Sequence, residues 1–274
     1  MSNDEYEIDA ARFAQTLREQ RSMQLKGGLY HLTQIQMAYN TNRIEGSRLS
    51  EEQTRYLYET RTITGDALVD DVVETSNHFR AFDAMLDHVG EPITADTLKN
   101  YHRILKSGTS DSEKEWFAVG DWKQVANAVG RIETTPPELV DREIARLLAK
   151  TPDRMSFSEI CDFHVEFETI HPFQDGNGRV GRLVMFEQCL ANDIMPFIVL
   201  DDDKAFYYRG LDQYDETPGF LTETFRKAQD DFYSRYSKFV PIRRQNDAAE
   251  ARQSYVPSTS RAAQGETLPP LPSM

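Results

Sequence analysis

The residues best suited to chemistry in this sequence lie together between His171 and Arg182, in the run HPFQDGNGRVGR. A neutral imidazole has a reference pKa of about 6.5 and can accept a proton near neutral pH. The two glycines in residues 175–178 let backbone N–H groups turn toward one point, and the first turn of a following helix adds free N–H donors. Arg179 and Arg182 are three residues apart, so on a helix they project from one side. The run therefore combines a base with a cradle for anions.

Two interpretations of this run stay open from the residues alone. A pair of arginines above an N–H nest suits a polyphosphate better than a single carboxylate, and Asp175 beside phosphates could hold Mg²⁺ through one or two oxygens. The same residues are also compatible with an ordinary turn followed by a helix start. The grouping of several compatible functional groups within one short run favours a nucleotide or phosphate site.

Helices on either side would position these groups. Apolar residues and two histidines recur at helical spacing before the run, which predicts a helix over 156–171 with one packed face: Phe157, Ile160, Cys161, His164, Phe167 and His171. Pro172 disfavours the helical conformation in the residue before it, so His171 should stand at the very end of that helix. A second helix is expected over 178–192.

The rest of the chain is mostly of helical pattern. A weakly amphipathic segment covers residues 5–25, and further helices are expected over 30–45, 51–60, 67–88, 94–106, 137–149 and 217–238. Gly46 can supply the left-handed residue that ends the helix at 30–45. Glycines and a proline pair interrupt the pattern between 108 and 137, where residues 124–135 are predicted to form a short hairpin or extended flap.

Composition excludes several classes of partner. The chain has 274 residues and a formal net charge of −14, which disfavours non-specific nucleic-acid binding and docking on an anionic membrane. No stretch approaches the roughly 20 apolar residues of a membrane span, and the acidic N-terminus is unlike a signal peptide. Cys161 and Cys189 fall within apolar helical patterns and are expected to be buried free thiols. We therefore expect a cytoplasmic protein.

The run from His171 to Arg182 resembles the signature of the Fic family, His-Pro-Phe-x-Asp/Glu-Gly-Asn-Gly-Arg-x-x-Arg, and matches it at every position. The resemblance covers about residues 30–215. It implies an all-α fold, a Fic helical core with a small β-hairpin flap at the active site. On this basis we expect a Fic domain over 29–240, an N-terminal helical extension over 1–28 and a disordered tail over 241–274.

The resemblance also implies a role for each signature residue. His171 would be the general base toward a Ser, Thr or Tyr hydroxyl of a target protein, and AMP would pass to that oxygen from ATP with release of pyrophosphate. Asp175 would ligate Mg²⁺ between the α- and β-phosphates. The phosphates would be held by the remaining nest and basic residues, Gly176, Asn177, Gly178, Arg179 and Arg182. The death-on-curing branch carries Ala and Lys in place of Gly176 and Gly178 and phosphorylates instead, so the two glycines favour AMP transfer.

A second constellation lies at Thr41–Gly46. Thr41 and Glu45 are four residues apart, on one helical face, and Glu45 at a helix C-terminus gains from a cationic partner, although most such glutamates are simply solvated. The segment resembles the Fic inhibitory motif, Ser/Thr-x-x-x-Glu-Gly/Asn. This implies an inhibitory helix over about 30–46, in which Glu45 pairs with Arg182 and prevents that arginine from holding the γ-phosphate.

Weaker signals complete the candidate site. Tyr207 and Tyr208 resemble the tyrosine pair that borders the adenine in many family members, with burial in the core as the alternative. Asp215 falls where relatives often have Asn, which weakens its assignment to the base. Val129 and Gly130 are the predicted flap contacts to an extended target segment, and a plain surface hairpin is the alternative.

Other polar groups receive structural interpretations. An acidic cluster is expected to form a solvated face: Asp66, Asp70, Asp71 and Glu74. The five remaining histidines have no metal-ligand spacing and are interpreted as structural or surface groups: His31, His78, His88, His102 and His164.

The leading hypothesis is a self-inhibited protein adenylyltransferase that uses ATP and Mg²⁺, acts on an unidentified target protein or on itself, and binds neither nucleic acid nor membrane. One alternative is a de-adenylylating hydrolase in which Glu45 orients water. Another is a low-turnover, nucleotide-regulated binding or toxin-like module. A homodimer is possible, and the sequence leaves the oligomeric state open.

Overall fold

The computed structural model describes residues 9–129 and 132–241. The chain divides into two units, Met1–Val240 and Pro241–Met274, and the helices and strands of the described residues all belong to the first. The tail predicted at 241–274 lies outside the described residues apart from Pro241.

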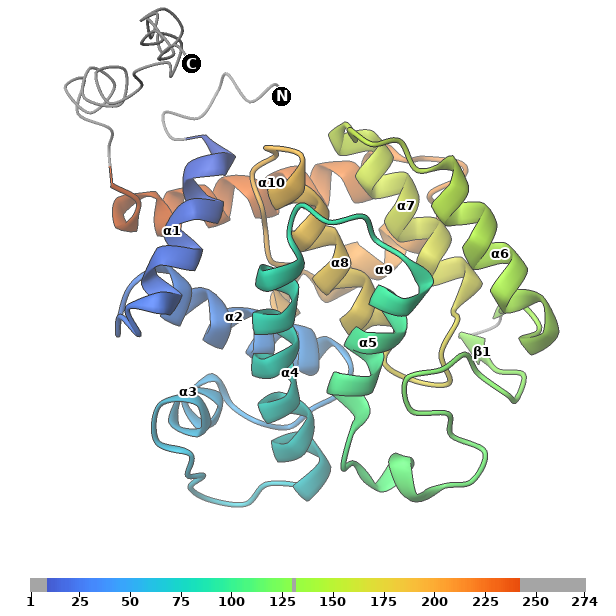
Figure 1. Cartoon of the computed structure of the whole chain (residues 1–274), viewed down its shortest axis with the longest axis horizontal. Coiled ribbons are helices and arrows are strands. Elements are labelled where there is room, and N and C mark those ends of the chain that lie inside the picture. The colour runs from blue at the N-terminus through green and yellow to red at the C-terminus, as the bar shows by residue number, and fades with distance from the viewer. Residues whose placement is uncertain (1–8, 130–131, 242–274) are drawn as a thin grey trace, which may run out of the picture. The chain divides into compact units, whose positions relative to one another are not determined.

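The described part of the first unit is built almost entirely from helices, which confirms the all-helical class predicted from the sequence (Figure 1). The helices are α1 (Ala10–Ser22), α2 (Leu29–Ile44), α3 (Glu51–Thr60), α4 (Val69–His88), α5 (Ala95–Lys106), α6 (Pro137–Lys150), α7 (Phe157–Ile170), α8 (Asn177–Ala191), α9 (Lys204–Asp212) and α10 (Gly219–Tyr236). Short 3-10 helices are η2 (Ser110–Glu113), η3 (Asp201–Asp203) and η4 (Ser237–Phe239). The sequence analysis did not predict α9, a short helix with few buried positions.

Two very short strands lie within the stretch predicted to be a hairpin. β1 (Ala128–Val129) pairs antiparallel with β2 (Ile132–Glu133), and Ala128 is opposite Glu133. Gly130 lies outside the described residues, so the target contacts predicted for Val129 and Gly130 stay predictions. The two strands pair within the stretch predicted from the sequence, and the role of this segment as a flap stays a prediction.

Helix ends are fixed by residues close in sequence. Ser50, Thr94 and Ser156 each form a capping box at the start of α3, α5 and α7. At α7 the Ser156 hydroxyl accepts the Glu159 N–H at 3.3 Å, and the Glu159 carboxylate accepts the Ser156 N–H at 2.7 Å. These bonds satisfy donors that a helix start leaves unpaired, and they set where α7 begins.

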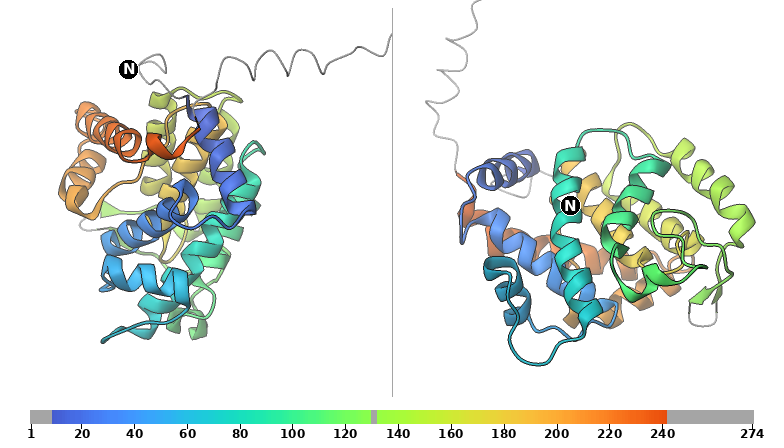
Figure 2. Two further views of the ribbon diagram at one scale, coloured as in Figure 1. Left: turned by 90° about the vertical axis from the view of Figure 1, so that its left-hand side faces the viewer. Right: turned by 60° about the horizontal axis from the view of Figure 1, so that its bottom comes forward.

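Helix α8 is the central element of the first unit. Every residue from Asn177 to Leu190 is buried, and α1, α2, α4, α5 and α7 all contact the helix (Figures 1 and 2). Phe186 of α8 packs its ring 5.6 Å from Phe82 of α4 and 5.9 Å from Phe232 of α10. Because α8 begins within the signature, this packing fixes the position of the candidate site.

A buried polar cluster joins three helices at the far end of α8. Glu187 accepts a hydrogen bond from the Tyr101 hydroxyl at 2.8 Å, and its other oxygen lies 2.6 Å from His88 Nδ1. Burial raises the pKa of Glu187, and the contacts with His88 and Tyr101 oppose that rise. The cluster ties α4 and α5 to α8, so it holds the helices that face the signature.

The two cysteines lie in α7 and α8. Cys161 and Cys189 are free and buried, as predicted, and burial raises the pKa of the Cys161 thiol to about 12. Among the helices of residues 9–129 and 132–241, none combines the length and apolarity that a bilayer crossing needs.

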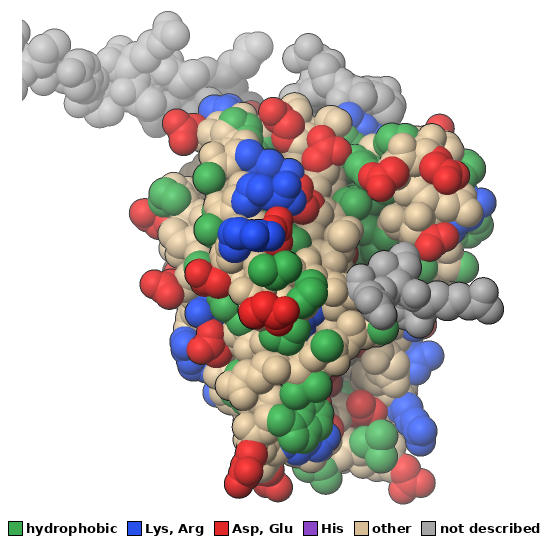
Figure 3. All heavy atoms as spheres, turned by 90° about the vertical axis from the view of Figure 1, so that its right-hand side faces the viewer, with side chains coloured by type: hydrophobic (Ala, Val, Ile, Leu, Met, Phe, Trp, Pro, Cys, Tyr) green, Lys and Arg blue, Asp and Glu red, His purple; other side chains and the backbone are tan. Residues whose placement is uncertain are grey.

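Figure 3 shows the face on the right-hand side of Figure 1, where basic and acidic side chains are interspersed.

One close helix contact gives a test of the packing. Gly210 of α9 faces α10, where an added Cβ would lie 2.8 Å from the Leu221 Cα. Alanine in place of a helical glycine would otherwise stabilise the helix by up to about 1 kcal/mol. We expect Gly210→Ala to lower the free energy of unfolding by about 1–3 kcal/mol, because α9 must move away from α10. Urea denaturation followed by circular dichroism measures this change.

The matched control for this experiment is Gly219→Ala in α10. An added Cβ there would have Glu223 Oε1 as its nearest neighbour, at 3.9 Å, so the free energy of unfolding should stay the same or rise. A Gly210→Ala protein as stable as the parent would show that the two helices are not packed this closely.

Candidate active site

His171 ends α7 in a left-handed conformation, with φ of 52° and its N–H bonded to the Phe167 carbonyl at 3.0 Å. Positive φ is uncommon for residues other than glycine and costs of order 1 kcal/mol or more, so the surrounding packing must impose it. The following Pro172 cannot continue the helix. The imidazole is therefore held at the end of a packed helix, as the sequence predicts.

The surroundings of His171 keep its ring neutral. Burial lowers the pKa of His171, and the nearby ammonium of Lys123 lowers it further. The backbone carbonyl of Glu168 and the carboxylates of Glu45 and Asp175 oppose this shift without cancelling it. A neutral imidazole at pH 7 can accept a proton, which is what a general base requires.

The loop after His171 is clamped by two side chains. Asn177 Oδ1 accepts the Phe173 N–H and Asn177 Nδ2 donates to the Phe173 carbonyl, both at 2.8 Å. The Phe173 ring stacks on His102 with centroids 4.1 Å apart. His102 Nδ1 accepts the Gly120 N–H, which leaves Nε2 to donate to the Asp175 carbonyl at 3.1 Å. The side chain of Asn177 thus shapes the loop, and His102 has the structural role predicted for it.

Gly176 forms the N-cap of α8 with φ of 83°, a conformation that favours glycine. An added Cβ would lie 3.5 Å from the His102 ring and 3.6 Å from the Lys106 side chain. The loop therefore approaches α5 closely at this point. The first turn of α8 follows directly, so its N–H groups and positive dipole end lie where the sequence predicts an anion cradle.

Arg182 is buried in α8 and paired with the end of α2. Its NH2 lies 2.5 Å from Glu45 Oε1, and its Nε donates to the Thr41 hydroxyl at 2.6 Å. The side chain of Arg182 is 3% exposed and that of Glu45 is 24% exposed. A Cβ on Gly178 would overlap Glu45 Oε1, so a larger residue there would require this carboxylate to move. The contact that the resemblance implies between Glu45 and Arg182 is present.

Arg179 belongs to a second group of charges. Its NH2 donates to Asp175 Oδ2 at 2.8 Å, and its NH1 lies 2.5 Å from Glu74 Oε2. Lys106 Nζ contacts the same two carboxylates, at 2.6 Å from Asp175 and 2.5 Å from Glu74. Although burial raises the pKa of Asp175, the cations of Arg179 and Lys106 hold it well below its usual range. The carboxylate is therefore ionised at any physiological pH.

The prediction of a solvated acidic face is wrong for two of its four residues. Glu74 lies between Arg179 and Lys106 with its side chain 16% exposed, and Asp71 is buried and accepts the Arg48 N–H at 2.9 Å. Their partners come from other parts of the chain, which spacing within the segment could not indicate. Asp66 is exposed as expected.

The two tyrosines have different environments. Tyr207 is buried, with its hydroxyl 2.9 Å from His164 Nε2 and 3.5 Å from Arg182 NH1. Tyr208 is 40% exposed, and its hydroxyl donates to the Ile44 carbonyl at 3.4 Å. Tyr208 is thus the more exposed member of the pair, and the adenine contact predicted for the two tyrosines stays a prediction. Asp215 is exposed.

The segment before β1 is tied to the signature loop. The Lys123 N–H donates to the Pro172 carbonyl at 2.9 Å, and Lys123 Nζ donates to Asn127 Oδ1 at 2.8 Å and Thr134 Oγ1 at 2.5 Å. Burial lowers the pKa of Lys123 to about 8. Sequence analysis did not single out Lys123 or Lys106, and it assigned Glu74 to a solvated face, although each contacts the signature or lies beside it.

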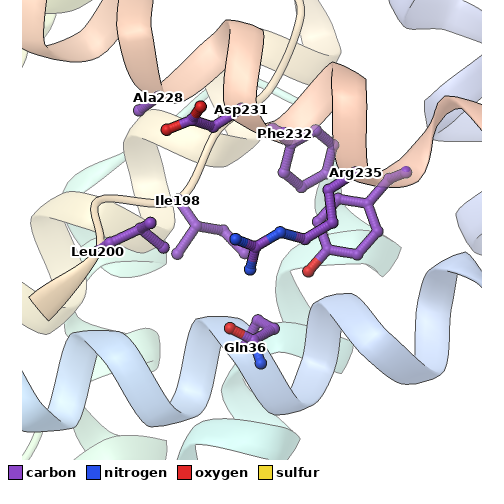
Figure 4. A pocket seen from close by; sticks show the side chains of 8 residues that line it. Gln36, Ile198, Leu200, Ala228, Asp231, Phe232 and Arg235 are labelled. Atoms are coloured by element: carbon purple, nitrogen blue, oxygen red, sulfur yellow. The ribbon is translucent and has the colours of Figure 1, made fainter. Parts of the chain in front are cut away.

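A small pocket lies elsewhere, between α2, α10 and the segment that precedes η3 (Figure 4). It is lined by Gln36, Ile198, Leu200, Ala228, Asp231, Phe232, Arg235 and Tyr236. The site residues predicted from the sequence are not among these, so the pocket is separate from the signature.

A central stretch of the chain matches the model of a known protein family. Residues 92–189 match the model of the Fic/DOC family. The chain is 26% identical to a protein adenylyltransferase Fic of Nematostella vectensis over 65% of its own length and 43% of that protein. It is 25% identical to the protein adenylyltransferase fic-1 of Caenorhabditis elegans over 63% of its length and 35% of that protein. The chain thus spans less than half the length of these curated relatives.

Solved structures share the fold. A Fic family protein from Desulfovibrio desulfuricans superposes with a TM-score of 0.64 at 23% identity, over 89% of this chain and 79% of that one. Fic-1 from C. elegans gives a TM-score of 0.63 at 21% identity, over 84% and 71% of the two chains. At these identities the likeness concerns the fold alone.

One further acidic group beside the signature was not singled out from the sequence. Glu168 of α7 has a buried Oε1 with no hydrogen-bond partner among the described residues, and a Cβ on Gly181 would lie 2.5 Å from that atom. Burial raises the pKa of Glu168 to about 8, and the Glu45 carboxylate adds to the rise while Arg182 opposes it. The carboxyl is mainly protonated at neutral pH.

This shift makes stability depend on pH with a definite sign. An unfolded glutamate ionises near pH 4.3, whereas folded Glu168 keeps its proton up to about pH 8. Between these values the folded state binds one proton more, so the free energy of unfolding falls as pH rises. Glu168→Gln removes this contribution to the fall in the free energy of unfolding. Its free energy of unfolding relative to the parent should grow by about 1–3 kcal/mol from pH 5 to pH 8 in urea denaturation.

Glu166→Gln is the control on the same helix, because the Glu166 carboxylate pairs at the surface with Arg146 and Lys150. Its stability difference from the parent should stay within about 0.5 kcal/mol across the range. A Glu168→Gln difference that is the same at both pH values would contradict the raised pKa.

Proposed function

We propose that this chain, whose residues 92–189 belong to the Fic/DOC family, is a self-inhibited protein adenylyltransferase that transfers AMP from ATP to a protein hydroxyl. Curated relatives that bear the name protein adenylyltransferase support the activity. We extend the domain to residues 29–240, which include the helix that carries Glu45. The target would be a Ser, Thr or Tyr of another protein or of this chain.

The observation that carries the proposal is the contact between Glu45 and the buried Arg182 at the first turn of α8. A carboxylate lies where an anion would bind, and it holds an arginine that could otherwise contact a phosphate. The site thus has both a phosphate-binding geometry and an internal anion that competes for it. That combination is expected of a nucleotide-binding enzyme that inhibits itself.

In the proposed reaction, one bond forms at the α-phosphorus of ATP and one bond to it breaks. The hydroxyl oxygen of the target attacks the α-phosphorus, its proton passes to the His171 imidazole, and the bond to the β-phosphate oxygen breaks so that pyrophosphate leaves. His171 suits the proton because its lowered pKa leaves the ring neutral. The N–H groups and arginines of α8 would stabilise the charge on the phosphates by positioning and electrostatics.

Mg²⁺ fits the chemistry of Asp175, whose ionised carboxylate is 44% exposed. No group of three or more potential metal ligands occurs in the part of the chain that the structure describes, so phosphate oxygens and water would complete the shell. When bound, the ion would neutralise charge on the phosphates. Asp175 would hold it, and Lys106 and Arg179 would keep that carboxylate ionised.

The proposed inhibition by the contact between Glu45 and Arg182 can be tested directly. We expect Glu45→Gly to raise AMP incorporation at least about 10-fold, which corresponds to about 1.4 kcal/mol, because Arg182 becomes free to hold a phosphate. Intact mass spectrometry after incubation with ATP and Mg²⁺ measures the gain of AMP on the chain or on proteins added as targets. The matched control is Glu115→Gly at an exposed glutamate away from the arginines.

The double variant Glu45→Gly with His171→Ala separates the base from the brake. It should lose AMP incorporation and still bind ATP by calorimetry, because the phosphate contacts remain. Equal rates of AMP incorporation in the parent and Glu45→Gly would contradict inhibition by Glu45. Undiminished transfer in the double variant would contradict the assignment of His171 as the general base.

A further inference from the structure

We propose that Lys106 is a third phosphate-binding cation of the nucleotide site, which Glu74 neutralises in the resting protein. The inference rests on the proposed function, since it adds a residue to the same site. Lys106 is the last residue of α5, outside the signature, and its role toward a ligand comes from its position beside Gly176 and Asp175.

Four side chains form an alternating ring of charges, Lys106, Asp175, Arg179 and Glu74. Asp175 Oδ2 lies 2.6 Å from Lys106 and 2.8 Å from Arg179. Glu74 uses one oxygen for each cation, at 2.5 Å in both cases. Both cations are almost fully buried, with side chains 2% and 3% exposed. Each cation therefore depends on these carboxylates for its stability in the interior.

The position of Lys106 relates it to the phosphate nest. Its side-chain carbons come within 3.6 Å of the place where a Cβ on Gly176 would stand, so its stem lines the glycine that opens α8. Its ammonium lies 2.6 Å from Oδ2 of Asp175, the residue before that glycine. A phosphate bound over the N–H groups of this turn would therefore have Lys106 and Arg179 as neighbouring cations.

The charge balance indicates how the site would bind a polyanion. Lys106 also lies 3.1 Å from Asp111, whose other oxygen pairs with Lys114, so three cations face three carboxylates and the group carries no net charge. A phosphate can approach favourably only where it replaces a carboxylate as the partner of the cations. Glu74 bridges both cations with its two oxygens, as two oxygens of a phosphate could. Glu74 is thus the partner that the ligand would replace.

The test compares ADP with adenosine, which differ only in the phosphates. Calorimetry at fixed Mg²⁺ gives both affinities, with every variant made in the Glu45→Gly chain so that Arg182 is equally available. We expect Lys106→Met to reduce the preference for ADP over adenosine at least about 10-fold, and to leave adenosine affinity within about 2-fold, because a charge-assisted hydrogen bond is lost. Lys106→Arg should keep most of the preference.

Lys99→Met is the matched control on α5. Lys99 pairs with Asp121 at 2.7 Å and lies over the Trp122 ring, and neither contact involves the signature. This variant removes the same charge from the same helix, so its preference for ADP should stay within about 2-fold of the parent. An equal loss in both variants would point to overall charge and overturn the proposal.

A gentler change tests the same idea without removing Lys106. Asp111→Asn takes away a competing carboxylate whose side chain is 27% exposed, and it should raise the preference for ADP about 2- to 5-fold. This arm decides the question if Lys106→Met does not fold, and an unchanged or lower preference then overturns the proposal. A chain that binds neither ADP nor adenosine would overturn the proposed nucleotide site itself. Unchanged ADP preference in a folded Lys106→Met protein would overturn only the role of Lys106.

Discussion

The burial of two arginine charges at the start of α8 is the constraint on which the rest of the site depends. Arg179 and Arg182 each have side chains only 3% exposed. A buried charge left without a partner costs several kcal/mol, so each guanidinium must meet carboxylates. The fold supplies them from three places, Glu45 after α2, Glu74 in α4 and Asp175 in the loop before α8. Helices α2 and α4 are thereby bound to α8 by charge as well as by apolar packing.

The proposed self-inhibition would follow from this constraint in physical terms. Cations that are to hold phosphates must be neutralised when no ligand is bound, and in a buried site only the protein can provide the counter-charge. In this proposal Glu45 and Glu74 would take the place of phosphate oxygens, each from a different helix. Ligand binding would then be an exchange of one anion for another. The affinity of the site then depends on how tightly its own carboxylates are held, as well as on the cations.

The sequence allowed prediction of features that depend on neighbouring residues. The position of His171 at a helix end follows from Pro172, and the anion cradle follows from the glycines and the helix start beside them. The pair of Glu45 and Arg182, far apart in sequence, was reached through resemblance to a family motif. Glu74 was assigned to a solvated face, because helical spacing gives the face of a residue and not the partner across from it. Its contacts with Lys106 and Arg179 span 32 and 105 positions.

The two carboxylates to which we assign an inhibitory role, Glu45 and Glu74, differ in how freely they can move. Glu45 is the residue after the last turn of α2, its side chain is 24% exposed, and Gly46 follows it with φ of 100°. A change of a few dihedral angles at this helix end could withdraw it from Arg182. Glu74 lies within the body of α4, so it can leave the cations only by a change of side-chain rotamer. In the proposed mechanism, a partner that binds the end of α2 would therefore release Glu45, whereas Glu74 would be displaced by the ligand that competes for Lys106 and Arg179.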